Sequence, residues 1–169
     1  MKPITPPKSA TTHDRPTKSP RRSHPRKRIL LVDDDAIVRD SLNDVLLGED
    51  YFVISAENRQ QALDFANTLR VDLVLLDLNM PIKNGWDTFA QLTTEHPLIP
   101  IIIATARPDQ LFMALGAGAG ALLEKPLDIP MLLNTIAKLL MESADIKLAR
   151  LAGNEAEFHY RMPACEVRR

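Results

Sequence analysis

Residues 72–81 read Asp-Leu-Val-Leu-Leu-Asp-Leu-Asn-Met-Pro, and they are the most informative segment about the fold. The run Leu73–Leu76 is continuously apolar instead of alternating, a pattern typical of a strand that is buried on both faces of a sheet. A carboxylate, Asp77, follows this run at once. The stretch therefore predicts a buried parallel sheet with a polar group at the end of one of its strands.

Four more short apolar runs flank this one, namely Ile29–Val32, Phe52–Ile54, Ile101–Ala104 and Ala121–Leu123. The intervals between the runs, and the segment after the last one, carry apolar residues at helical spacing. Strands that alternate with helices need right-handed crossovers and give a parallel sheet covered on both faces. We predict a doubly wound α/β fold with a five-stranded parallel sheet in the flavodoxin-like order 2-1-3-4-5.

Several residues predict where the helices begin. The expected caps and first-turn residues are Asp35 for the first helix, Asn58 for the second, Asp109 for a short fourth and Pro130 for the fifth. The pair Asn84-Gly85 predicts a turn before the third helix.

Charge divides the 169-residue chain into three parts. Residues 1–27 hold eight basic residues, one acid and six prolines, and we expect this basic tail to be disordered because it has little apolar surface to bury. Residues 28–143 form the predicted globular domain and carry a net charge of -9. Residues 144–169 form an extension that is expected to be helical at first and loose after Gly153.

No apolar run approaches the roughly 20 residues that a membrane span needs, and no apolar segment follows the basic, proline-rich N-terminus, so we expect no signal peptide. The single cysteine, Cys165, has no partner for an internal disulfide. The sequence therefore predicts a cytoplasmic protein without a membrane segment.

Polar residues follow four of the five predicted strands. They are Asp33 and Asp34 after the first, Asp77 after the third, Thr105 at the end of the fourth and Lys125 after the fifth. Ligands of open parallel sheets bind outside the carboxyl ends of the strands, where the first and third strands are neighbours in the predicted order. We therefore expect these side chains to converge.

Three clustered carboxylates repel one another, by about 4 kcal/mol for a pair at 4 Å and an effective dielectric constant of 20. A divalent cation removes this repulsion, and oxygen ligands favour Mg²⁺, with Mn²⁺ as an alternative. The expected ligands are Asp33, Asp34, Asp77 and the backbone carbonyl of Asn79. A metal-neutralised Asp77 can act as a nucleophile on phosphorus, with Lys125 and the Thr105 hydroxyl contacting the phosphoryl oxygens.

With these residues in place, the sequence resembles the CheY-like receiver domains of two-component signalling over about 115 of its 169 residues. The matching segments are Ile29-Leu-Leu-Val-Asp-Asp-Asp35, residues 72–81 with Gly85, Pro100-Ile-Ile-Ile-Ala-Thr-Ala-Arg107, Gly116-Ala-Gly-Ala119 and Leu123-Glu-Lys-Pro126. The resemblance implies a receiver domain at 28–143, with Asp77 as phosphoacceptor, Asp33 and Asp34 as Mg²⁺ ligands, and Thr105 and Lys125 as phosphate-sensing residues.

The resemblance also implies partners and mechanism. The chain would be a single-domain response regulator that takes a phosphoryl group from a sensor histidine kinase or a histidine phosphotransfer protein. It would then act on a downstream protein, and it would be no enzyme beyond magnesium-dependent phosphorylation and dephosphorylation of itself. A homodimer through the fourth helix, fifth strand and fifth helix and a cis Lys125–Pro126 bond are further expectations.

One position departs from the family pattern, and a second is expected to affect the lifetime of the phosphoryl group. Many receivers carry Tyr or Phe three residues before the lysine, where this chain has Leu122, so the aromatic half of the switch is missing. Arg107, two residues after Thr105, occupies a position that influences how long the phosphoryl group persists in this family.

Two alternatives compete with the signalling module. A phosphatase of the haloacid-dehalogenase type also uses an Asp nucleophile, magnesium and a lysine, but it needs a second Asp where this chain has Asn79. The basic tail could instead be a nucleic-acid arm, since clustered Lys and Arg provide a salt-dependent footprint. Nucleic acid is the less favoured partner, because residues 1–27 contain no aromatic residue to stack on bases.

Overall fold

The computed structural model describes residues 25–80, 84–153 and 159–161. Its strands are β1 (Arg28–Val32), β2 (Phe52–Ala56), β3 (Leu73–Asp77), β4 (Ile101–Thr105), β5 (Ala121–Glu124) and β6 (His159–Arg161). Its helices are α1 (Ala36–Gly48), α2 (Arg59–Thr68), α3 (Asn84–Glu95), α4 (Leu111–Gly116), α5 (Ile129–Met141) and α6 (Ala144–Leu151), with a 3₁₀ turn η1 (Pro108–Gln110) before α4.

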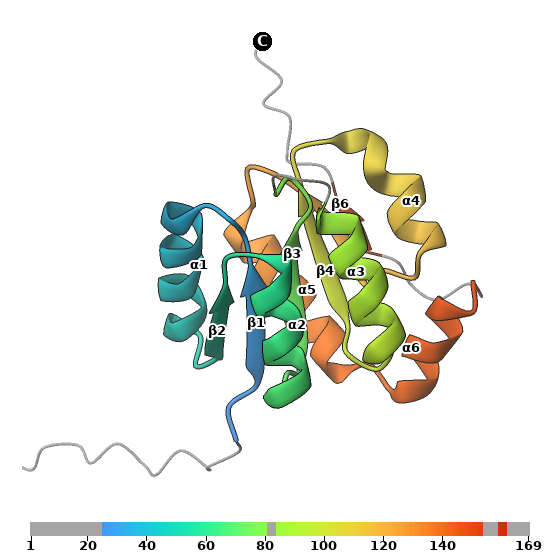
Figure 1. Cartoon of the computed structure of the whole chain (residues 1–169), viewed down its shortest axis with the longest axis horizontal. Helices are drawn as coiled ribbons and strands as arrows, with labels where there is room; N and C mark the ends of the chain where they lie inside the picture. The colour runs from blue at the N-terminus through green and yellow to red at the C-terminus, as the bar shows by residue number, and fades with distance from the viewer. Residues whose placement is uncertain (1–24, 81–83, 154–158, 162–169) are drawn as a thin grey trace, which may run out of the picture.

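The strands form one parallel sheet in the order β2-β1-β3-β4-β5-β6 (Figure 1). The five predicted strands therefore occur in the predicted order, and the doubly wound fold is confirmed. The sixth strand was not predicted. It lies parallel to β5, with Leu122 opposite Tyr160, and covers part of the outer edge of β5.

Alternate residues of the strands point to opposite faces of the sheet, and each face has its own apolar core. Leu30, Val74 and Ile103 belong to the cluster that packs against α2, α3 and α4. Leu31 and Leu75 belong to the cluster that packs against α1 and α5. The central strands are buried on both sides, which explains why their sequences are continuously apolar.

The helix starts agree with the sequence at three places. Asp35 caps α1 by accepting from the N–H of Ile37 at 2.8 Å, Asn58 caps α2, and Pro130 lies in the first turn of α5.

Two predicted helix starts were wrong. Asp109 does not cap α4, because the 3₁₀ turn that Pro108 begins precedes that helix. Asn84 and Gly85 do not form a turn but are the first two residues of α3. A Cβ atom at Gly85 would lie 2.6 Å from the Cα of Leu78, so the glycine is needed for close backbone approach.

The C-terminal extension packs back on the domain. Ser143 caps α6, and Arg150, near its end, is buried in an ion pair with Glu142. The turn after α4 contains Gly118 at a φ of 79°, where a Cβ atom would lie 2.7 Å from Leu151 Cδ2. The absence of a side chain at Gly118 thus lets the end of α6 approach this turn.

Two predictions fall largely outside the described residues. The proposed disorder of the basic tail, residues 1–27, lies outside the described residues except at 25–27, and the proposed looseness after Gly153 lies outside them except at 159–161, which form β6. Among the described residues, no helix has the length and apolar character needed to cross a bilayer.

Candidate functional site

The end of β1 supplies two of the acids. Asp33 is 2% exposed, and its Oδ1 accepts a hydrogen bond of 2.9 Å from the N–H of Asp35. Asp34, the next residue, is exposed. The turn into α1 therefore holds one carboxylate inside and one at the rim.

The end of β3 supplies the third acid. Asp77 is 4% exposed, and its Oδ1 accepts a hydrogen bond of 2.9 Å from the N–H of Asn79. The N–H of Leu78 donates to the carbonyl of Ala104 at 3.0 Å, which ties this turn to β4. The Asp77 carboxylate is thus buried and oriented by the backbone N–H of Asn79.

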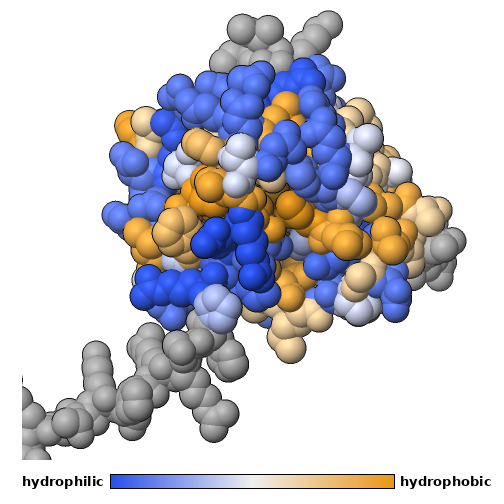
Figure 2. All heavy atoms as spheres, turned by 60° about the horizontal axis from the view of Figure 1, so that its bottom comes forward, coloured by the Kyte–Doolittle hydropathy of each residue, from blue (hydrophilic) through white to orange (hydrophobic). Residues whose placement is uncertain are grey.

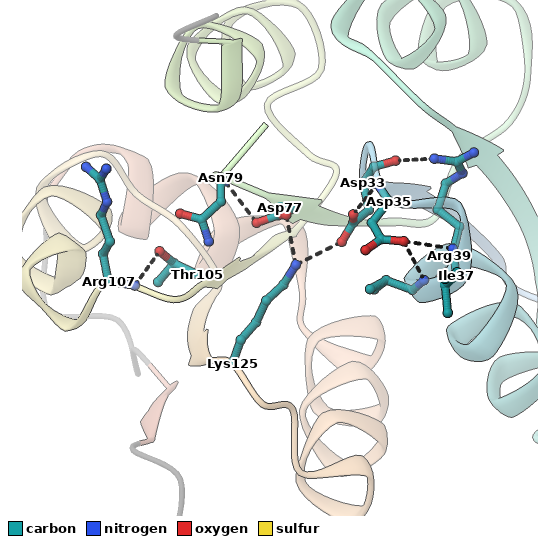
Figure 3. A network of polar contacts seen from close by, with 10 residues as sticks. Asp33, Asp35, Ile37, Arg39, Asp77, Asn79, Thr105, Arg107 and Lys125 are labelled. Carbon is teal, nitrogen blue, oxygen red and sulfur yellow. Dashed lines mark hydrogen bonds and ion pairs between the residues drawn. The ribbon is translucent and has the colours of Figure 1, made fainter. Parts of the chain in front are cut away.

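Lys125 joins the two buried acids (Figure 3). Its Nζ lies 2.8 Å from Oδ2 of Asp77 and 2.9 Å from Oδ2 of Asp33. Burial lowers the pKa of Lys125, but the hydrogen bonds and charges of Asp77 and Asp33 outweigh burial and raise the pKa above its ordinary value. The ammonium is therefore a fixed positive charge. The Lys125–Pro126 bond is cis, as predicted.

Thr105 ends β4 and is fully buried. Its hydroxyl oxygen accepts a hydrogen bond of 3.1 Å from the N–H of Arg107, which leaves the hydroxyl hydrogen for donation to a ligand. In Figure 3, Thr105 and Asn79 lie on the side of Asp77 away from Asp33, and the Arg107 guanidinium lies beyond Thr105. The predicted site residues therefore surround Asp77.

The acids meet the requirements of a hard divalent cation. One carboxylate oxygen from each of Asp33, Asp34 and Asp77 lies within 4.8 Å of the others. The set contains oxygen ligands only, and Asp34 at the rim leaves one side open, as Mg²⁺ with retained water ligands prefers. These residues fit the predicted metal.

Two contacts near the site were not predicted. Arg39, one helical turn after Asp35, donates from Nη1 to the carbonyl of Asp33 at 2.8 Å. Its place on the first turn of α1, above the end of β1, was the available signal. The Trp86 indole donates to Gln110 at 2.7 Å and so links α3 to η1, a contact that sequence spacing does not reveal.

The position of the missing aromatic is also defined. Leu122 is fully buried in the core beneath α3 and α4. It therefore fills space inside the domain.

Comparisons with known proteins point to one family. A model of the family described as "Response regulator receiver domain" matches residues 29–137. The transcriptional regulatory protein CpxR of Escherichia coli strain K12 is 41% identical over 118 residues, or 69% of this chain and 50% of CpxR. The DNA-binding response regulator MtrA of Mycobacterium tuberculosis strain H37Rv is 42% identical over 57% of this chain and 42% of MtrA. The chain spans about half the length of the curated relatives it matches.

Solved structures give the same result. A CheY-like receiver domain protein of Methanospirillum hungatei has a TM-score of 0.64 and 31% identity over 68% of this chain and 94% of that one. The response regulator TrrA of Thermotoga maritima, solved in complex with Mg²⁺-BeF, has a TM-score of 0.63 and 30% identity over 67% of this chain and 98% of that one.

Receiver domains of this kind serve two-component signalling, bind Mg²⁺ in an acidic pocket and are generally not catalytic enzymes. On the family match, the relatives and the fold, this chain belongs to the response regulator receiver domain family.

Proposed function

We propose that this chain accepts a phosphoryl group on Asp77 from a histidine kinase or a histidine phosphotransfer protein, and that the phosphorylated form signals by binding a downstream protein. The observation that carries this proposal is the placement of the Lys125 ammonium 2.8 Å from Asp77 and 2.9 Å from Asp33. A buried nucleophile, a fixed cation and two more acids within metal-binding reach form the minimum set for aspartyl phosphorylation.

In the proposed transfer, one carboxylate oxygen of Asp77 forms a bond to phosphorus while the P–N bond of a donor phosphohistidine breaks. The bonding electron pair leaves with the imidazole nitrogen, and Asp77 becomes an acyl phosphate. Lys125 is placed to offset the charge on the phosphoryl oxygens, and the Thr105 hydroxyl can donate a hydrogen bond to one of them. Mg²⁺ held by Asp33, Asp34, Asp77 and the Asn79 carbonyl would neutralise the acids and the incoming phosphoryl group.

TrrA supports the metal part of this proposal, because its structure contains Mg²⁺ and BeF and this chain shares its fold and 30% of its sequence over the matched region. The names of CpxR and MtrA describe transcriptional regulation and DNA binding. Since this chain spans about half of either protein, DNA binding by an effector domain is a second candidate output.

The phosphatase alternative is less well supported. Asn79 occupies the position where a phosphatase of that type needs a second acid. Its backbone N–H donates a hydrogen bond to Asp77. An amide cannot protonate a leaving group or activate water as a carboxyl group does. We therefore propose a switch without substrate turnover.

A homodimer through α4, β5 and α5 would have to accommodate β6, which lies along part of the outer edge of β5. Such a dimer would pack on the helices or displace the strand.

Intact-mass measurement tests the proposed function. The full chain is incubated with acetyl phosphate, a small acyl phosphate donor, with and without Mg²⁺. We expect one added phosphoryl group on wild type only with Mg²⁺, and none on Asp77→Asn. Addition to Asp77→Asn at the wild-type level would refute Asp77 as the acceptor.

A further inference from the structure

The end of the sheet opposite Asp77 gathers positive charge. Arg26, Lys27 and Arg28 lead into β1, and Arg70 lies shortly before β3. Because β1 and β3 are neighbouring parallel strands, their beginnings meet at one edge. Figure 2, which brings this end forward, shows hydrophilic residues beside an apolar surface.

The sheet itself holds these residues in place. The N–H of Phe52 donates to the carbonyl of Lys27 at 2.9 Å, and the N–H of Arg28 donates to Asp72 at 2.9 Å. Phe52, the first residue of β2, is paired with Arg28 in the register of the ladder. The basic side chains therefore extend from a fixed backbone.

One arginine of this group lacks an acidic partner. The Arg28 guanidinium lies 5.6 Å from the centroid of the Phe52 ring, and within the described ranges no carboxylate pairs with it. Phe52 is 50% exposed. An arginine held on an exposed ring presents both a charge and a planar stacking surface.

The acids at this end do not cancel the positive charge. Arg26 pairs with Asp50 at 2.8 Å, while Lys27 and Arg70 share Asp72 at 3.5 and 3.1 Å. The four basic residues and the two acids that pair with them carry a net charge of +2, which the nearby exposed Glu49 reduces to +1.

Lys147 on α6 lies close enough to this end of the sheet for the charges of Lys27 and Asp72 to act on it. Burial lowers its pKa, and the charges of Lys27 and Arg150 add to the lowering against the opposing charges of Glu142 and Asp72. Burial is the largest cause of this lowering, and the positive and negative neighbours of Lys147 oppose each other.

A hollow of about 290 Å³ lies within this group, lined by Pro25, Arg26, Arg28, Phe52 and Arg70. The acids around Asp77 lie one strand length away, about 17 Å at 3.3 Å per residue. That distance exceeds the Debye length of about 8 Å at physiological salt, so their repulsion of an anion at this end is largely screened.

We propose that this hollow binds single-stranded nucleic acid, with Arg26, Arg28 and Arg70 contacting phosphates and a base stacking on the exposed Phe52 ring. Grooves that combine basic side chains with aromatic stacking surfaces favour unpaired bases, because a duplex does not expose its base faces. Residues 1–24, which precede Pro25 and Arg26 in the sequence, contain six basic residues and one acid. An acidic peptide would use the arginines but has no requirement for the exposed ring.

Fluorescence anisotropy of the full chain tests this proposal. The probes are a labelled thymidine oligonucleotide of about 16 nucleotides and its duplex with an adenosine strand, titrated between about 50 and 200 mM salt. We expect salt-dependent binding with preference for the single strand. Phe52→Leu should weaken single-strand binding at least fivefold and leave duplex binding unchanged. Arg28→Gln with Arg70→Gln should weaken both.

Matched variants separate this site from the tail and from other surfaces. Phe112→Leu alters a ring that is 82% exposed on α4, and Lys138→Gln removes an exposed charge on α5; neither should change binding. Arg21→Gln with Arg22→Gln removes two charges from the tail and should not reduce the single-strand preference.

Three results would overturn the proposal: no binding at the lowest salt, equal affinity for both probes, or wild-type affinity of Phe52→Leu. Should Phe52→Leu not fold, ultraviolet crosslinking of the wild-type chain to the oligonucleotide decides instead. A crosslink in the peptide that contains Phe52 supports the site, and crosslinks confined to residues 1–24 contradict it.

Discussion

Two aspartates flank the same strand and have opposite surroundings. Asp72 immediately precedes β3, where the N–H of Arg28, the Arg70 guanidinium and the Lys27 ammonium all contact it. Asp77 ends β3, where two further acids and one lysine surround it. Asp72 therefore has an excess of positive partners, whereas Asp77 belongs to a group with an excess of negative charge.

The contrast shows that the acid at the start of β3 contributes to stability, whereas the acid at its end belongs to the candidate site. A carboxylate such as Asp72, which already accepts hydrogen bonds and has positive neighbours, needs no ligand to stabilise its charge. A carboxylate held among other carboxylates is stabilised by a cation, so its site has affinity for a metal and for the group that the metal carries.

The largest expected effect concerns the metal. Asp34→Asn removes an exposed acid of the cluster and should weaken Mg²⁺ binding more than tenfold, since a charged ligand is lost. Calorimetric titration measures it, with Asp44→Asn, an exposed acid on α1, as the control. Equal Mg²⁺ affinity of Asp34→Asn and wild type would remove Asp34 from the proposed ligands.

The second-largest expected effect concerns the contribution of Asp72, at the start of β3, to stability. Asp72→Ala deprives the Arg28 N–H of its acceptor and should lower the free energy of unfolding by about 1.5–3 kcal/mol. Asp77→Asn weakens the contact with Lys125 but relieves repulsion from Asp33 and Asp34, and because these two effects oppose each other the net change should be less than about 1 kcal/mol. Urea unfolding measures both variants, and a larger loss for Asp77→Asn would reverse the comparison.

The pH dependence of the Asp72 contribution follows from its pKa. Burial raises this pKa, but the bond from the Arg28 N–H and the charges of Arg70 and Lys27 lower it below the ordinary value of 3.8. Because the folded pKa is the lower one, the stabilisation is complete above pH 3.8 and is lost as pH falls through the folded pKa. The difference in unfolding free energy between wild type and Asp72→Ala should therefore stay constant from neutral pH down to about pH 5 and shrink below pH 3.8. A difference that shrinks already above pH 5 would contradict this.

The smallest effect concerns phosphoryl lifetime. Arg107→Ala removes an exposed cation beside Thr105 and should change the decay rate of phosphorylated protein by more than twofold. Arg70→Ala removes another exposed cation, at the other end of the sheet, and should leave the decay unchanged. Decay is followed by intact mass after removal of the donor, and identical rates for Arg107→Ala and wild type would refute the role of Arg107.

The fold was predictable because continuous apolar runs such as Leu73–Leu76 have few explanations other than doubly buried strands. The sixth strand was not predictable. His159–Arg161 is short and polar, and only its position beside β5 makes it a strand. The turn predicted at Asn84-Gly85 was wrong because these residue types suit both a turn and the start of a helix that packs closely on a neighbouring backbone.

The candidate site was predictable for a related reason. Strand ends in a parallel sheet lie at one edge, so Asp33, Asp77 and Lys125 were expected to meet, and the structure brings them together. The contact of Arg28 with Phe52 was not foreseen, because it depends on residues before the strands, whose side chains the apolar pattern does not place.

The assignment of Asp77 as phosphoacceptor is tested by locating the phosphoryl group after reaction with acetyl phosphate and Mg²⁺. Borohydride reduces an acyl phosphate to the alcohol, and peptide mass mapping then identifies the modified aspartate. We predict reduction at Asp77 and none at Asp72, Asp33 or Asp34. Reduction at any of the other three with Asp77 unchanged would contradict the assignment of Asp77 as the phosphoacceptor.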